Sequence, residues 1–305
     1  MVAFGMQLPI QSQSTIYAQP WEAAAGPAEL VQIALACEAA GFDYVAVCDH
    51  VAIPVDLAEK MRTDWWDTIA TLSYLAAVTE RVRLLSHVYV LPYRHPLAVA
   101  KAWATLDALS GGRAILGVGA GHVEREFDVL EVPFAERGRL LDEGIDAVRA
   151  ALTDEFASHA GERWRFEDLG QRPRPVQRSV PIWVGGSSKP AMRRAAERGD
   201  GWLPQGIPEG GMAAGIDFIR AHRAVSRGGD PITIGALSGP LHVGDPDWET
   251  PRCVRGSAEK IAGYLRTYVE LGVDQIQVGF VSRSADELAD QIAAFAADVA
   301  PLVNH

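Results

Sequence analysis

The feature that most constrains the fold of this chain is a regular alternation of short β-type runs with longer segments of helical period. Alternation of this kind is typical of a parallel α/β fold. The runs that predict strands cover residues 2–8, 44–48, 82–91, 114–119, 180–184, 202–203, 232–237 and 273–280. Each run is followed by a helical segment or by room for one, and eight such units predict a closed (β/α)8 TIM barrel.

The helical segments and the stretches that fit neither pattern complete this prediction. Helices are expected over residues 27–40, 68–78, 97–109, 138–152, 190–198, 211–225, 257–271 and 285–297. Four further stretches are expected to be insertions that build walls over the barrel mouth, at residues 51–66, 120–137, 154–179 and 238–255. Trp164, Phe166 and Val176 suggest that the third stretch packs on the barrel. The whole chain, residues 1–305, is therefore expected to form one domain.

The composition excludes several classes of function. Lys and Arg number 28 and Asp and Glu 39, which gives a formal net charge of −11. An acidic chain without a Lys/Arg cluster argues against nucleic acid or an anionic membrane as a partner. No apolar run approaches the roughly 18 residues of a spanning helix, and the first residues lack the regions of a secretory signal. Cys37, Cys48 and Cys253 have no metal-type spacing, so a cytoplasmic protein without a bound metal is expected.

Two glycine-rich turns follow predicted strands. Gly119-Ala120-Gly121 closes the fourth strand and fits either a tight turn or the close approach of a planar ligand to the backbone. Gly185-Gly186-Ser187-Ser188 follows the fifth strand and opens a helix near Pro190. Backbone N–H groups at a helix N-terminus can bind an anion, so this turn predicts a phosphate cradle, with N-capping by Ser187 or Ser188 as the alternative.

Polar residues stand at the ends of the second and third predicted strands. Asp49-His50 fits a general acid/base pair, a hydrogen-bonding clamp for a cofactor, or a turn aspartate beside a satisfied histidine. Ser86-His87-Val88 lies inside a β-branched run, where His87 either points inward or is a core histidine with its own partner. Four aromatic residues fit either walls of the mouth or core packing: Trp65, Trp66, Tyr93 and Trp202.

Long blocks of the sequence resemble the luciferase-like superfamily, most closely the branch that uses the deazaflavin coenzyme F420. The blocks occur in the expected order over most of the chain and include FGMQLP, AAGFDYVAVCDHV, VYVLPYRHPLAVAKAWATLDALSGGRAILGVGAGH and RPRPVQRSVPIWVGG. The resemblance implies a (β/α)8 barrel with an isoalloxazine-type ring across its mouth. It also implies a bulge with a non-proline cis peptide in the third strand, at His87-Val88 or at Ser86-His87.

The resemblance also implies roles for individual residues. A sugar-phosphate dehydrogenase branch has a glutamate directly after the G-x-G turn, where this chain has His122, with Glu124 two residues further on. This departure argues against a sugar phosphate as the substrate. The resemblance matches His50 to a histidine of the active site, and His50 or His122 is expected to supply the proton, since histidine titrates near neutral pH. The expected cofactor-binding residues are Asp49, Ser86, His87, Val88, Gly119, Ala120, Gly121, Gly185, Gly186, Ser187 and Ser188.

The function implied by the resemblance is hydride transfer between F420 and a small-molecule substrate. The alternative on the same barrel is an FMN-dependent two-component monooxygenase, in which reduced FMN from a partner reductase reacts with oxygen. A flavin-binding protein without catalysis is the third possibility. The resemblance also suggests a homodimer, for which the apolar face of Leu72, Leu75, Ala76 and Thr79 could form the interface or could cover the barrel.

Overall fold

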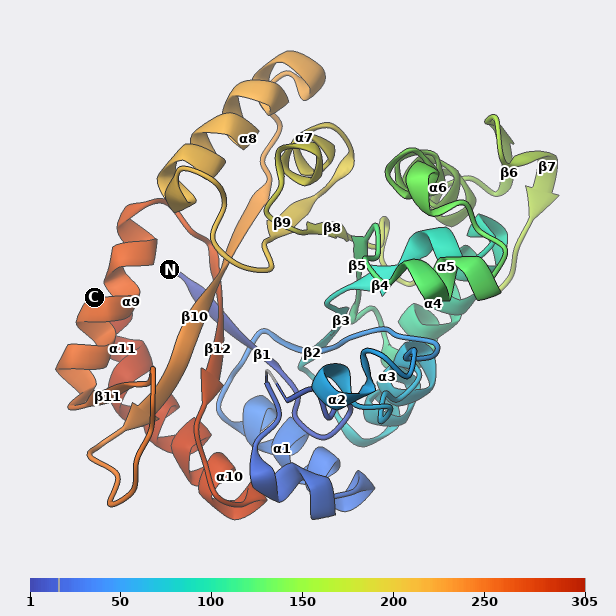
Figure 1. Cartoon of the computed structure of the whole chain (residues 1–305). Coiled ribbons are helices and arrows are strands. Elements are labelled where there is room, and N and C mark those ends of the chain that lie inside the picture. Colours follow the sequence, from blue (N-terminus) through green and yellow to red (C-terminus); the bar gives the residue numbers. More distant parts are fainter. Residues whose placement is uncertain (16, 305) are drawn as a thin grey trace.

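Eight parallel strands close into a barrel in the computed structural model of the chain, which describes residues 1–15 and 17–304 (Figure 1). In order around the barrel they are β1 (Ala3–Gln7), β2 (Tyr44–Val47), β3 (Arg83–Ser86), β5 (Ala114–Gly119), β8 (Ile182–Gly185), β9 (Gly201–Leu203), β10 (Thr233–Val243) and β12 (Gln275–Phe280). Each strand pairs in parallel with the next, and β12 pairs with β1 to close the ring. The (β/α)8 prediction is confirmed.

Helices cover the outside of the barrel, as Figure 1 shows. The main ones are α1 (Pro27–Ala39), α3 (Thr68–Val78), α4 (Pro96–Ser110), α6 (Arg137–Thr153), α7 (Lys189–Arg198), α8 (Gly211–Arg227), α9 (Ala258–Glu270) and α10 (Ala285–Ala294). The face of α3 that was considered for a dimer is buried within the chain, because Leu72, Leu75, Ala76 and Thr79 are at most 7% exposed. That face therefore covers the barrel. Within the described residues, no helix has the length and apolar character needed to cross a membrane.

The third strand differs from its prediction as a single run. β3 ends at Ser86, and pairing with β5 resumes in the short strand β4 (Tyr89–Val90). The peptide bond between His87 and Val88 is cis. Of the two positions that the resemblance implied for a cis peptide, the structure therefore has the one at His87-Val88.

Other boundaries also differ from the prediction. β10 extends to Val243 and takes in the start of the predicted insertion 238–255, with an irregular register between Leu237 and Pro240. Proline has no N–H to donate to a sheet, which explains an irregularity at that point. The last predicted helix ends at Ala294 and continues as a π-helical turn, η4 (Phe295–Val299), and α11 (Ala300–Val303).

The segments between the main barrel strands and helices contain short elements of their own. These are η1 (Pro20–Ala24), α2 (Ala58–Met61), η2 (Leu91–Tyr93), α5 (Glu124–Val129), η3 (Phe134–Glu136), β6 (Phe156–Ala160), β7 (Arg165–Gly170) and β11 (Val254–Gly256). The β6–β7 hairpin packs on α6, where Glu143 accepts hydrogen bonds from the backbone of Arg163 and Trp164. Trp164 and Phe166 are buried as expected, whereas Val176 is exposed.

Large side chains inside the barrel lie over glycines of the neighbouring strand. A Cβ atom on Gly5 would lie 2.2 Å from the ring of Tyr44, and one on Gly201 would lie 2.5 Å from the ring of Trp183. Contacts this short do not occur between real atoms, so glycine is required at both positions. Because each aromatic ring lies over a glycine of the neighbouring strand, the rings can fill the narrow interior of the barrel.

Candidate functional site

Val88, which follows the cis peptide, is wedged between two glycines at the ends of β5 and β8. A Cβ on Gly119 would lie 2.4 Å from Val88 Cγ2, and one on Gly185 would lie 2.2 Å from Val88 Cγ1. Val88 is only partly buried, although it sits at the C-terminal ends of buried strands. Val88 and the two glycine backbones therefore form a low surface without protruding side chains at the mouth of the barrel.

Asp49 is buried at the end of β2 and its carboxylate is fully paired. Arg94 forms a bidentate ion pair with it, with Nη1–Oδ2 and Nη2–Oδ1 distances of 2.6 and 2.8 Å. The same carboxylate accepts the backbone N–H of Val90 at 2.8 Å, and the Arg94 guanidinium lies 4.1 Å from the ring centre of Tyr89. Asp49 thus holds β4 against β2, and its expected contact with a cofactor stays a prediction.

His50 belongs to a hydrogen-bonded cluster centred on Glu126 of α5. His50 Nδ1 lies 2.7 Å from Glu126 Oε2, and the Tyr93 hydroxyl donates to the same oxygen at 3.1 Å. Glu126 Oε1 accepts the backbone N–H groups of Val51 and Ala52 at 2.6 and 3.1 Å. The side chains of His50 and Glu126 are 8% and 1% exposed. One carboxylate therefore fixes the segment after β2, the histidine and the tyrosine together.

The charge on Glu126 follows from this environment. Burial opposes its ionisation, but the hydrogen bond and charge of His50 and the two backbone N–H groups outweigh burial and lower the pKa of Glu126. Burial and the nearby carboxylate raise the pKa of Tyr93, which stays protonated and donates. An ionised Glu126 makes His50 Nδ1 the donor and leaves Nε2 as the ring nitrogen that can exchange a proton.

His122 lies beside His50, so the two candidate catalytic residues are brought together. Their ring centres are 5.4 Å apart with planes at 89°, and the ring of Trp65 lies 4.3 Å from that of His50. Partial burial and the neighbouring His50 lower the pKa of His122, and Glu126 opposes the effect. A histidine whose pKa is lowered from 6.5 is mostly a neutral imidazole at pH 7. His122 is an exposed residue.

Ser86 and His87 are the buried side of the bulge. The Ser86 hydroxyl donates to the Gly117 carbonyl at 2.7 Å and accepts the Gly117 N–H at 3.0 Å, so it bridges the two strands where β3 ends. His87 points into the barrel, 3% exposed, with Nε2 3.3 Å from the Leu203 carbonyl oxygen. Burial lowers the pKa of His87 to about 4. A buried histidine with its own partner was one of the two predictions for this residue.

The turn Gly185–Ser188 starts at the last residue of β8 and leads directly into α7, as predicted. Ser188 caps the helix by accepting the Ala191 N–H at 3.4 Å, and the Ser187 hydroxyl donates to the Gln205 carbonyl at 3.2 Å. Gly186 has φ +93°, a left-handed value that favours glycine. N-capping by Ser188 is thus present, while the phosphate cradle stays a prediction. Trp202 is fully buried and belongs to the core.

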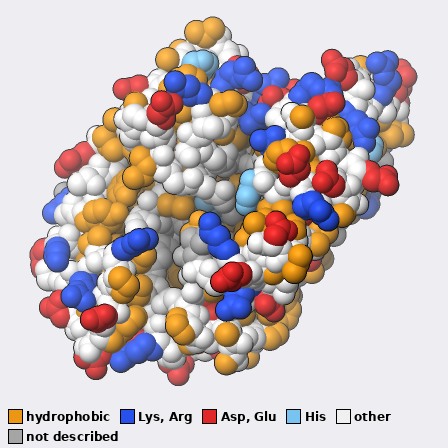
Figure 2. All heavy atoms as spheres, in the orientation of Figure 1, with side chains coloured by type: hydrophobic (Ala, Val, Ile, Leu, Met, Phe, Trp, Pro, Cys, Tyr) orange, Lys and Arg blue, Asp and Glu red, His pale blue; other side chains and the backbone are white. Residues whose placement is uncertain are grey.

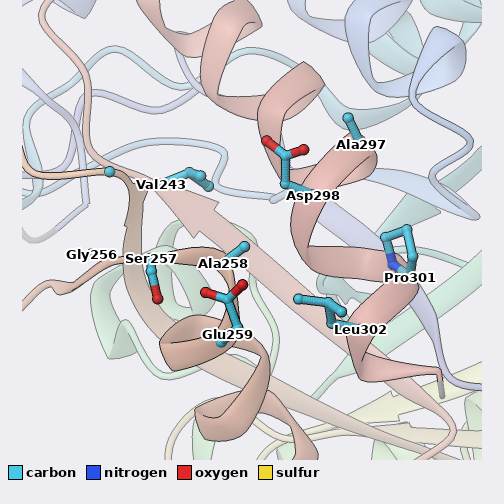
Figure 3. Close-up of a pocket in the computed structure, with 10 residues that line it drawn as sticks. Val243, Gly256, Ser257, Ala258, Glu259, Ala297, Asp298, Pro301 and Leu302 are labelled. Carbon is cyan, nitrogen blue, oxygen red and sulfur yellow. The ribbon is translucent and has the colours of Figure 1, made fainter.

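One face of the molecule is visibly hollowed. Figure 2 shows a central depression with histidine side chains at its edge. A second cavity, of about 570 Å³, opens between α9 and the C-terminal helix and is lined by Glu259, Asp298 and Leu302 among others (Figure 3). None of the predicted site residues lines it. Within residues 1–15 and 17–304, no group of three or more His, Cys, Asp or Glu side chains is arranged to hold a metal ion.

Comparison with known proteins identifies the family. A family model described as luciferase-like monooxygenase matches residues 2–254. The chain belongs to this family. The resemblance inferred from the sequence blocks is therefore confirmed.

Several curated relatives of this luciferase-like chain match it over part of its length. An uncharacterized protein of Mycobacterium tuberculosis (strain ATCC 25618 / H37Rv) is 36% identical over 188 residues, which are 58% of this chain and 65% of that protein. An F420-dependent glucose-6-phosphate dehydrogenase of Nakamurella multipartita is 34% identical over 58% of this chain and 52% of that enzyme. An FMNH2-dependent dimethylsulfone monooxygenase of Pseudomonas putida is 34% identical over 54% of this chain and 46% of that enzyme. The chain thus spans less than two thirds of each of these relatives.

Solved structures agree on the architecture. A monooxygenase from Streptomyces bottropensis superposes with a TM-score of 0.79 at 20% identity, over 98% of this chain and 99% of that one. The F420-dependent tetrahydromethanopterin reductase of Methanopyrus kandleri has a TM-score of 0.76 at 18% identity, again over 98% and 99%. At these identities the likeness shows the fold alone.

Glu126 contacts the predicted site residue His50, and Tyr93 donates to the same carboxylate, and the sequence pointed to neither of these roles. Glu126 lies 76 positions from His50, and only the placement of α5 brings them together. The acidic run of α5 offers Glu124 as an equal candidate by composition. The one available signal is the adjacent Phe127, an aromatic residue in a short polar helix, which anchors that side of α5 in the core.

Proposed function

We propose that this protein is an F420-dependent oxidoreductase that transfers a hydride between the deazaflavin ring and a small organic substrate. The observation that carries the proposal is His50, held by Glu126 through Nδ1 at the mouth of a luciferase-like barrel. A histidine fixed in this way can exchange a proton through Nε2 with a group in the mouth. The F420-dependent relative supports the choice of cofactor.

The residues at the mouth suit a planar ring. Gly119 and Gly185 cannot carry a side chain while Val88 lies between them, so a ring can approach the backbone there. The turn Gly185–Ser188 at the N-terminus of α7 would hold a phosphate of the cofactor. When bound, the deazaflavin supplies the hydride chemistry, and the protein orients it and shields it from water.

The chain's own part in the reaction is to place a proton. A bound, reduced deazaflavin would supply the hydride to the unsaturated carbon of the substrate, and a residue of the chain would supply the proton that the other atom of the double bond takes up. We assign the proton to His50 Nε2, with Glu126 as the residue that positions the ring. His122, whose ring lies beside that of His50, is the second candidate, and it would have to be protonated before it could donate.

An FMN-dependent monooxygenase is the second candidate, favoured by the similarity to the dimethylsulfone monooxygenase. Such an enzyme would need a partner reductase to supply reduced FMN. In either case we propose that residues 1–305 act as one barrel domain, within a homodimer.

Titration of the purified protein with F420 and, separately, with FMN tests the proposal. Tight binding of F420 with negligible binding of FMN, followed by fluorescence, is the expected result. Preference for FMN together with oxygen consumption in the presence of reduced FMN would instead establish the monooxygenase.

A further inference from the structure

The interior of the barrel is lined mainly by apolar side chains, but three polar groups also face it. Trp183 belongs to the apolar cluster there, together with the ring of Tyr44. In the part of the chain that the structure describes, the Tyr44 hydroxyl, His87 Nδ1 and Gln277 Oε1 are buried and have no hydrogen-bond partner. Each of these three side chains is at most 6% exposed. Buried polar atoms in native proteins almost always have a partner, so one is expected for these three.

The register of the strands brings Tyr44 and Gln277 to the same level of the barrel. Gly5 of β1 pairs with Tyr44 of β2 on one side and with Gln277 of β12 on the other. The Tyr44 ring lies over Gly5, because a Cβ atom on that glycine would be 2.2 Å from Cζ, the carbon that bears the hydroxyl. Gln277 alternates with Ile276 and Val278, which pack in the core between strands and helices, so the Gln277 side chain points into the barrel. The Tyr44 hydroxyl is therefore directed across Gly5 toward the strand that carries Gln277.

His87 joins this group from the other side of the barrel. Its imidazole reaches from the end of β3 to the end of β9, where Nε2 is 3.3 Å from the Leu203 carbonyl oxygen. Burial lowers the pKa of His87, and the Leu203 carbonyl and the Gln277 side chain oppose this effect. Gln277 therefore adjoins the imidazole, and the three polar side chains surround one region of the interior.

The surroundings of these atoms decide which of them donate and which accept. A carbonyl oxygen only accepts, so Nε2 of the neutral His87 donates to Leu203 and Nδ1 is left as an acceptor. Gln277 Oε1 is a second acceptor. Burial raises the pKa of Tyr44 well above its ordinary value, so its hydroxyl stays protonated and can donate. One hydroxyl proton cannot satisfy two acceptors, whereas a water molecule donates twice and also accepts.

We propose that the interior of the barrel binds a water molecule that donates to His87 Nδ1 and Gln277 Oε1 and accepts from the Tyr44 hydroxyl. An ion does not fit this set of partners, because an anion would face two acceptors and a cation would be buried without an opposite charge. His87 immediately precedes Val88, so the water would tie the interior side of the mouth to β2 and β12. The proposal depends neither on the cofactor nor on the reaction proposed above.

A high-resolution crystal structure of the purified chain tests this site directly. Density for a water oxygen at about 2.7–3.2 Å from all three atoms is the expected result. A reversed Gln277 amide, whose Nε2 donates to His87 Nδ1 with no water between them, would overturn the proposal. Crystals soaked in thallium(I) separate water from a cation, since an anomalous peak at the site would identify a cation and also overturn the proposal.

A pair of matched variants tests the same site in solution, where relaxation dispersion of water deuterons counts long-lived internal water molecules. Gln277→Leu keeps the approximate size of the side chain but removes one acceptor, and it is expected to hold about one such water fewer than the parent. Gln32→Leu is the control, because Gln32 donates to Asp286 at an exposed position, and its count should equal that of the parent. Equal counts in the parent and in Gln277→Leu would contradict the proposal. The crystal structure of the parent decides the question even if Gln277→Leu fails to fold.

Discussion

At the scale of single residues, the site depends on one carboxylate. Glu126 contacts His50, Tyr93 and the backbone after β2. Because its pKa is lowered from the ordinary value of 4.5, the carboxylate stays ionised at pH values somewhat below 4.5. A buried carboxylate with several donors both orients a histidine and decides which ring nitrogen carries the proton. The proton-exchanging atom of His50 is therefore set by a residue on a different insertion.

Glu126→Gln is expected to slow the reaction by about 100-fold while the fold is kept, because an amide cannot enforce the same tautomer of His50. The pH dependence of kcat should change shape together with its magnitude, which the loss of a purely structural contact would not cause. Glu124→Gln, two residues away on an exposed position, is the control and should retain the parent profile. A Glu126→Gln enzyme with the parent rate and pH profile would contradict the positioning role.

At the scale of elements, the alternating pattern was enough to predict every barrel strand, but not what happens inside the third one. The run 82–91 is mostly apolar, with valine at positions 82, 88 and 90, and nothing in its periodicity marks the interruption at His87-Val88. That feature came from the family resemblance. Pairings such as Asp49 with Arg94, 45 positions apart, depend on how the ends of β2 and β4 meet. Local patterns predict elements, whereas site contacts of this kind are set by the assembled barrel.

The packing of Val88 against two strands gives a prediction at this scale. Gly119→Ala is expected to lower the free energy of unfolding by about 1–3 kcal/mol, because the added methyl would overlap Val88. Adding Val88→Ala should recover most of this loss by making room. Gly263→Ala on α9, where a Cβ meets nothing within 4 Å, should be neutral or mildly stabilising. Urea unfolding measures all three; a Gly119→Ala protein as stable as the parent would show that the strands can separate.

At the scale of the whole molecule, the closed barrel encloses an ionisable group that must stay neutral. His87 has a pKa of about 4 in the folded chain, against an ordinary value of 6.5. As the pH falls below 6.5, His87 becomes protonated in the unfolded chain, whereas in the folded chain it stays neutral until about pH 4. Stability from this group is therefore complete above pH 6.5 and is lost as pH falls toward 4.

Unfolding measured at pH 7 and pH 5 should show this loss. The parent is expected to lose about 2 kcal/mol of unfolding free energy from His87 over that interval. His87→Asn cannot titrate, so its loss over the same interval should be smaller by that amount, even if it is less stable at pH 7. Parallel pH dependences of the two proteins would mean that His87 is protonated in the folded state as readily as in the unfolded chain.

The wedge of Val88 between Gly119 and Gly185 also limits the routes by which such a site can evolve. The three positions share one volume, so a side chain at either glycine is accommodated best after residue 88 has become smaller. The order of mutations then matters, because a smaller residue 88 makes room for a later side chain, whereas a side chain added first carries the stability loss expected of Gly119→Ala. The effect of one substitution therefore depends on another, which is epistasis. We expect relatives with a side chain at position 119 or 185 to carry a residue smaller than valine at position 88.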